Sequence, residues 1–114
     1  MSRNPEARDL FPGALEIMIL ESLRHRPMHG YALVKHIKQV SDNLLQVEEG
    51  SLYPALYRLE LDGAVSATWG VSENNRKAKY YEITRRGRKL IAKQQETWGR
   101  LSAAVDRVLA RQPR

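Results

Sequence analysis

The order in which hydrophobic periodicities follow one another constrains the fold of this chain more than any other feature of its sequence. Three stretches repeat apolar residues at helical spacing, two shorter β-prone runs follow them, and a last long stretch returns to helical spacing. The helices and strands expected from these patterns cover residues 13–24, 30–42, 51–62, 65–69, 78–83 and 84–109. The chain is therefore predicted to be mainly α-helical with a small β-hairpin.

Four residues fix the ends of the expected helices. Pro54 has no amide hydrogen and its ring clashes with the carbonyl four residues back, so it fits only in a first helical turn. Ser51 is then the expected N-cap of the third helix, and Gly63 follows that helix where glycine can take the left-handed conformation. Thr84 is the expected N-cap of the last helix.

Composition places the chain in one domain. Its 114 residues are 42% hydrophobic and 28% charged, which is ordinary for a globular protein, and the absence of cysteine excludes disulfides and thiolate metal sites. The longest stretch without a charged residue, 63–72, is far shorter than the roughly 20 apolar residues of a membrane-spanning helix. Residues 1–6 lead into mixed charge, not into the apolar core of a secretory signal. We therefore expect a cytoplasmic protein without a membrane partner.

The sequence offers little to catalysis, cofactors or metals. The seven glycines are scattered singly, so neither a phosphate-binding loop nor a dinucleotide fingerprint is present, and no serine lies in a G-x-S-x-G motif. The candidates for metal or acid–base chemistry are His25, His29 and His36, and Pro27 keeps the first two off one helical face. We predict no enzymatic activity, no cofactor and no metal site.

The net charge of +6 lies in the second half of the chain. Residues 1–57 hold six Lys and Arg against seven Asp and Glu, whereas residues 58–114 hold thirteen against six. Between positions 76 and 93, eight basic residues accompany one acid, Glu82. A basic run alone is equally compatible with a solvated face, but such a patch also suits a polyanion.

Helix, helix, helix, strand, hairpin loop, strand is the element order of a winged helix-turn-helix, which places its third helix in the major groove of DNA. Residues 13–83 are expected to form this DNA-binding domain after an N-terminal arm of residues 1–12. Arg76, Lys77 and Lys79 lie on the predicted hairpin, where phosphate contacts would be made. The alternative is a protein-binding winged helix that uses the same basic face on an acidic partner.

Three side chains of the third helix lie off its buried leucine stripe and are available to a partner: Tyr53, Tyr57 and Arg58. Arg58 is the predicted phosphate or guanine contact. A tyrosine on a helix is more often half-buried than base-reading. The hydroxyl of Ser51, together with the free amides at the helix start, could also hold a phosphate.

The last helix, residues 84–110, carries an apolar seam with heptad spacing. Ile91, Trp98 and Val105 repeat every seven residues, Leu101 and Val108 take the adjacent seam position, and Gln94 is the polar member. A helix from 85 to 109 extends roughly 37 Å, longer than a three-helix core covers on one side. The seam therefore predicts a homodimer through this helix.

Trp98 admits two interpretations. An aromatic residue on a seam usually belongs to dimer packing. Alternatively, two Trp98 rings across a twofold axis would frame a slot for a flat apolar ligand, with Gln94 supplying a hydrogen-bonding group. The second interpretation predicts a small aromatic effector.

Several segments together resemble the PadR family of bacterial transcriptional regulators. They are His29–Tyr31, Gly50–Glu60 and Lys79–Thr84 with Gly87, and the likeness extends over nearly the whole chain. The most specific part is the Tyr53-Pro54 pair inside a helix that ends in Leu-Glu and Gly. The short length and single C-terminal helix resemble the smaller members, which dimerise through that helix.

This resemblance implies a homodimeric repressor of nearby genes, often one released by a small molecule. It favours DNA contact by Tyr53 and Tyr57, and it implies that a tryptophan in the last helix lines a ligand site, as in some drug-responsive members. Together with the charge pattern, it predicts a transcriptional regulator that binds a pseudo-palindromic site on double-stranded DNA. The protein-binding winged helix remains the alternative.

Overall fold

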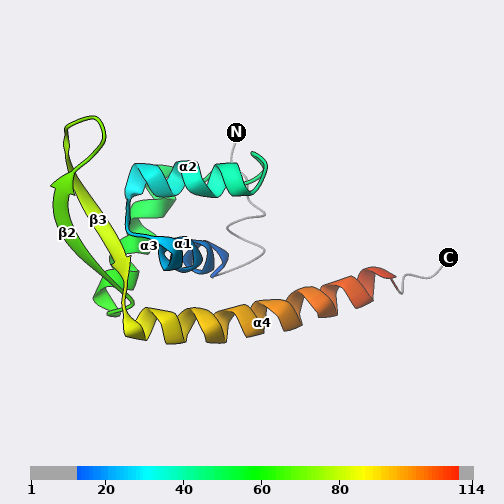
Figure 1. Cartoon of the computed structure of the whole chain (residues 1–114). Helices are drawn as coiled ribbons and strands as arrows, with labels where there is room; N and C mark the ends of the chain where they lie inside the picture. Colours follow the sequence, from blue (N-terminus) through cyan, green and yellow to red (C-terminus); the bar gives the residue numbers. More distant parts are fainter. Residues whose placement is uncertain (1–12, 111–114) are drawn as a thin grey trace.

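The computed structural model describes residues 13–110, so the predicted N-terminal arm of residues 1–12 lies outside the described residues. Figure 1 shows three helices packed together, a β-hairpin at one side of them and a long last helix along their base. The elements in chain order are α1 (Ala14–His25), β1 (Met28–His29), α2 (Gly30–Val40), α3 (Glu49–Leu61), β2 (Val65–Val71), β3 (Lys77–Ile83) and α4 (Arg85–Ala110). The predicted fold class, mainly helical with a small hairpin, is confirmed.

The hairpin belongs to a three-stranded antiparallel sheet in the order β1-β3-β2. Val65 pairs with Ile83 at its base and Val71 with Lys77 at its far end, so the connecting loop is residues 72–76 and the strands are longer than predicted. β1 was not predicted, because two residues are too few to show an alternating pattern. It pairs Met28 with Tyr81 and ties the start of α2 to the hairpin.

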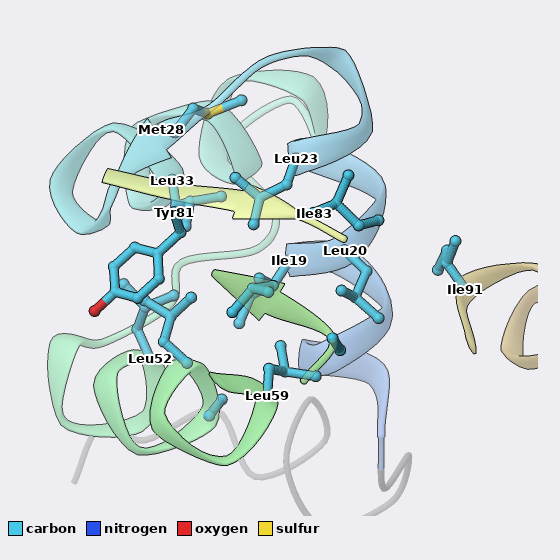
Figure 2. Packing of buried hydrophobic residues seen from close by; sticks show 14 residues of the cluster. Ile19, Leu20, Leu23, Met28, Leu33, Leu52, Leu59, Tyr81, Ile83 and Ile91 are labelled. Carbon is cyan, nitrogen blue, oxygen red and sulfur yellow. The ribbon is translucent and has the colours of Figure 1, made fainter. Parts of the chain in front are cut away.

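One apolar core joins the helices to the sheet (Figure 2). Each helix contributes residues three or four positions apart, as in Ile19 and Leu23 of α1 or Leu52, Leu56 and Leu59 of α3. Tyr81 on β3 is buried as well, whereas the neighbouring Tyr80 is only partly covered, because successive side chains of a strand point to opposite faces. Burial of these side chains fixes α3 against α1 and the hairpin.

The start of α3 differs from the prediction. Ser51 is not the N-cap: α3 begins at Glu49, Glu48 occupies the cap position, and no side chain caps the helix. The Glu48 carbonyl oxygen accepts from the amides of both Ser51 and Leu52, at 3.0 and 2.9 Å, so a tight first turn satisfies these groups without a hydroxyl. Pro54 therefore lies inside the helix, beyond its first turn. The Ser51 amide is engaged within α3 and is not a free phosphate donor.

The join between α3 and α4 is held by a turn and a close backbone approach. Gly63 has a φ of 78°, as predicted for the residue after a helix. The Thr84 hydroxyl donates to the Gly63 carbonyl oxygen at 2.6 Å and accepts from the Gly87 amide at 3.0 Å, which confirms Thr84 as the cap of α4. A Cβ at Gly87 would overlap the Ala64 carbonyl oxygen, so the start of α4 lies directly on the body of the molecule.

α4 is 26 residues long and continues well past the three-helix body (Figure 1). Ile91 departs from the predicted dimer seam: it is 2% exposed and packs in the core of its own chain (Figure 2), because it lies within two turns of the Gly87 contact. Further along, Leu101 and Val105 are 44% and 40% exposed. Within residues 13–110, no helix combines the length and apolar character needed to cross a bilayer.

Candidate nucleic-acid interface

The face of α3 opposite its leucine stripe is open to solvent. Helical spacing places Gly50, Pro54, Tyr57 and Leu61 along this face, and the Tyr57 side chain is 63% exposed. The same spacing places Ser51 and Arg58 on one flank and Tyr53 on the other. The predicted contacts of this helix thus share one surface, and Pro54 and Leu61 join them. A binary hydrophobic pattern did not single out these two, because they are apolar residues on an exposed face.

Arg58 is exposed, but it has a partner. Its Nη2 atom donates to Glu16 Oε2 on α1 at 2.8 Å, and the carboxylate is the less exposed of the two groups. Glu16 therefore holds the guanidinium at the edge of the α3 face. To reach a base or a phosphate, Arg58 must share or leave this carboxylate.

Tyr53 lies between α3 and the start of α2. A Cβ at Gly30 would overlap its ring, so glycine at that position allows the tyrosine to lie against the helix start. The Tyr53 side chain is still 43% exposed, and burial, followed by the nearby Glu49, raises the pKa of its hydroxyl. The phenol stays neutral at physiological pH and keeps a proton to donate. Tyr53 thus packs against the start of α2 with part of its ring and leaves the rest of its side chain accessible to a partner.

The wing, defined as residues 65–83, carries the predicted phosphate contacts in two different settings. Arg76 and Lys77 are exposed near its tip, and the Lys77 ammonium lies 5.7 Å from the centre of the Trp69 ring. Lys79 is less free, since its Nζ lies 3.4 Å from Glu60 Oε1 on α3 and 5.7 Å from the Tyr81 ring. Lys79 thereby ties the wing to α3 and sets the two surfaces side by side.

His29 has a structural role that no pattern in the sequence indicates. Its Nδ1 accepts from the Ala32 amide at 3.1 Å and caps α2, while its Nε2 lies 3.5 Å from Glu73 Oε1 in the wing loop. A hydrogen bond from its own backbone amide, with a smaller contribution from His29, lowers the pKa of Glu73. Histidine is a rare cap, so only the spacing of three residues to Ala32 could have signalled it.

The other two histidines approach one another. The rings of His25 and His36 are 6.5 Å apart, and burial, followed by Arg26 and His25, lowers the pKa of His36. Between residues 13 and 110, no three His, Cys, Asp or Glu side chains gather closely enough to hold a metal ion.

A groove of about 950 Å³, here called the wing groove, separates the wing from the start of α2. Tyr53 lines it, so it is continuous with the exposed face of α3. Arg26 and Lys35 also line it, and neither was among the predicted site residues. Both come from residues 1–57, where acidic and basic residues nearly balance, so the charge count along the sequence did not indicate them.

The predicted effector residues lie together on α4, one turn apart. Trp98 is half-buried. The Oε1 atom of Gln94 is buried and accepts no hydrogen bond from residues 13–110. A buried amide oxygen in this state is costly unless another group supplies a donor.

Comparisons with known proteins agree with this arrangement. A transcriptional regulator from Clostridium thermocellum is 29% identical, with a TM-score of 0.79 over 87% of this chain and 96% of that one. A PadR-like transcriptional regulator from Bacillus cereus is 28% identical, with a TM-score of 0.77 over 96% of this chain and all of the other. A PadR family transcriptional regulator from Eggerthella lenta is 31% identical, with a TM-score of 0.73 over 88% of this chain and 85% of that one.

The family model of the PadR-like transcriptional regulators matches residues 19–93. This span runs from the core of α1 through α3 and the wing to the first turns of α4, and so includes every element that builds the surface described above. Its members are DNA-binding regulators of transcription and not enzymes. With its fold, its basic wing and this match in agreement, the chain belongs to the PadR-like family of transcriptional regulators.

Proposed function

We propose that this regulator is a homodimeric, ligand-responsive repressor that binds a pseudo-palindromic operator. In this proposal residues 13–83 bind DNA and residues 84–110 form the dimer. The observation that carries it is the exposed α3 face lying beside a basic wing, with Lys79 and Glu60 joining the two. A helix and an adjacent cationic hairpin are suited to read a groove and to hold the flanking backbone.

Base reading is assigned to α3. Tyr57 is the most exposed of the predicted contacts on this helix that could reach a base edge, and Arg58 offers the planar fork that pairs with guanine. Tyr53 and Ser51 flank them, as a hydroxyl donor at the wing side and a hydroxyl at the α1 side. Arg76, Lys77 and Lys79 are assigned to phosphates, which contribute affinity but no sequence preference.

The test compares binding to the DNA upstream of the regulator's own gene with binding to a scrambled duplex, at two salt concentrations. We expect tighter binding to the upstream DNA and a smaller preference in Tyr57→Ala or Arg58→Ala, at about 1–3 kcal/mol per lost base contact. Tyr57→Phe, which keeps the ring, separates the hydroxyl from packing. Equal affinity for both duplexes, with capture of an acidic protein instead, would favour the protein-binding alternative.

Dimerisation is assigned to the far part of α4. The exposure of Leu101 and Val105 supports this, because two apolar side chains one turn apart on a long helix are covered at low cost by a second copy of the same helix. The twofold axis would place the two α3 helices on half-sites about one turn of DNA, or a multiple of it, apart.

Ligand response is assigned to Gln94 and Trp98. The buried Gln94 oxygen supports a ligand that donates a hydrogen bond, and the indole of Trp98 supplies a flat apolar wall. Such a ligand would act by binding more tightly to a dimer whose two α3 helices are wrongly spaced for DNA. A binding preference of about 1.4 kcal/mol for that state would lower the operator affinity tenfold.

The effector site is tested by tryptophan fluorescence in a Trp69→Phe background, so that Trp98 alone reports. We expect planar aromatic compounds to quench Trp98 saturably and to release operator DNA over the same concentration range. A Trp98 shielded from every compound and from acrylamide would assign this residue to packing alone.

A further inference from the structure

The wing groove has two walls of different origin. Trp69, Arg76 and Lys77 of the wing form one wall, and the other is formed by Tyr31 and Lys35 of α2 together with Arg26 from the link between α1 and β1. Figure 1 shows the wing standing beside the N-terminal end of α2. Because Tyr53 of α3 also lines the groove, a molecule lying on the α3 face can continue into it without leaving the protein surface.

The groove is strongly cationic. Five Lys and Arg side chains line it against one carboxylate, Glu73. Lys79 is paired with Glu60, but Arg26, Lys35, Arg76 and Lys77 form no ion pair with any carboxylate of residues 13–110. Four cations without an ion-pair partner, accompanied by Glu73 alone, produce a local positive potential that an anion would relieve.

Aromatic rings hold two of these four cations, Lys35 and Lys77, in place without cancelling their charge. The Lys35 ammonium lies 5.5 Å from the centre of the Tyr31 ring, just as the Lys77 ammonium lies 5.7 Å from that of Trp69 on the opposite wall. A cation over a ring face is attracted by the ring quadrupole, yet it keeps its full charge and its hydrogen-bond donors. The two lysines are thus partly ordered before any ligand arrives.

We propose that the wing groove holds the sugar–phosphate backbone of one DNA strand, with Arg26 and Lys35 as phosphate-binding residues facing Arg76 and Lys77. The proposal rests on the DNA binding proposed above and extends it, since Arg26 and Lys35 lie outside both α3 and the wing. An open channel with cations on both sides suits an extended polyanion better than a compact ligand, which needs an enclosed and largely apolar pocket. Glu73 is the one lining group that repels the strand.

The test measures the salt dependence of binding to a random duplex by fluorescence anisotropy. Arg26→Ala and Lys35→Ala should each lower the slope of log affinity against log salt by about one unit per lost contact per subunit. Lys93→Ala is the matched control, because it removes one exposed cation from α4, outside the groove. Glu73→Gln should strengthen binding, whereas Glu96→Gln on α4 should leave it unchanged.

The proposal would be overturned if Arg26→Ala and Lys35→Ala left the salt slope as unchanged as Lys93→Ala does. If Lys77→Ala still lowered the slope in the same experiment, DNA binding by the wing would stand, and only the assignment of Arg26 and Lys35 to phosphates would be wrong. Absence of binding to any duplex by the unmodified protein would refute the proposed function itself. Circular dichroism checks that each variant keeps the native helix content.

Discussion

At the scale of single residues, two glycines determine how closely the elements approach. Gly30 makes room for the ring of Tyr53, and Gly87 lets the start of α4 rest on the Ala64 carbonyl. The sequence marked both positions only as parts of a family resemblance, because a glycine needed for close approach has the same local signal as one in a loop. The contact that explains each lies 23 residues away in sequence, and local patterns do not reach that far.

Gly87→Ala should destabilise the fold by about 1–3 kcal/mol, since the added Cβ overlaps backbone that cannot move aside. Gly99→Ala is the control, because nothing lies within 4 Å of a Cβ at that position of the same helix. There the change should stabilise by up to about 1 kcal/mol through helix propensity. Urea unfolding midpoints measure both, and equal midpoints would contradict the close approach at Gly87.

The ion pair of Arg58 leads to a second prediction at this scale. Glu16→Gln frees the guanidinium and should raise the affinity for random DNA by up to about fivefold, the equivalent of a surface ion pair. Glu21→Gln removes the same charge from α1 but leaves Arg58 paired. Anisotropy titrations with both variants give the comparison. A similar gain in the two would mean that net charge alone is responsible.

At the scale of elements, the sequence predicted whether a segment is a helix or a strand better than it predicted where that segment begins and ends. The three helices, the hairpin and α4 follow from periodicity and from Gly63 and Thr84, whose roles are local. The start of α3 could not be predicted in this way, because the Glu48 carbonyl, and not the Ser51 side chain, satisfies the first amides. Arg26 and Lys35 escaped prediction because only the tertiary fold brings them opposite the wing.

The packing of α2 on α1 makes stability depend on pH. The folded chain holds the pKa of His36 below its ordinary value of 6.5, chiefly through burial and then through Arg26 and His25. The unfolded chain therefore binds more protons as pH falls below about 6.5, and stability decreases from there until His36 is protonated in the folded state too.

Comparing the unmodified protein with His36→Gln isolates this effect, since other titrating groups are common to both. The difference in unfolding free energy should be constant above about pH 7.5 and should shift in favour of His36→Gln on acidification. Urea unfolding at half-unit pH intervals measures it. Parallel pH profiles for the two proteins would show that His36 has the same pKa folded and unfolded.

At the scale of the whole molecule, the prediction concerns assembly. Val105→Glu would place two carboxylates against each other across the proposed twofold axis, so the dimer should dissociate and operator affinity should fall with it. Ala103→Glu, which adds the same charge to an exposed position of α4 outside the heptad seam, should leave the dimer intact. Sedimentation velocity distinguishes the two, and a monomeric unmodified protein at micromolar concentration would contradict the model.

The heptad seam of α4 is the place where the sequence prediction and the folded single chain differ. The heptad repeat predicted one continuous contact from Ile91 to Val108, but Ile91 packs in its own core. Heptad periodicity predicts that a residue will be buried, but it does not tell whether the residue is buried by its own chain or by a second chain. The division between intramolecular and proposed intermolecular burial therefore falls between Ile91 and Leu101, and only the fold could locate it.

The rigid join of α4 to the body has a mechanical consequence. With Gly87 and Ile91 fixed, the 26 residues of α4 form an arm of about 39 Å whose near end moves with α3. In the proposed dimer the two arms would cross near Leu101 to Val108, about 30 Å from each body, so a change of about 6° in the crossing would shift a body by roughly 3 Å. In the proposed dimer, the distance between the two α3 helices would depend on the length of α4, so lengthening α4 by one turn would change the half-site spacing that the dimer accepts.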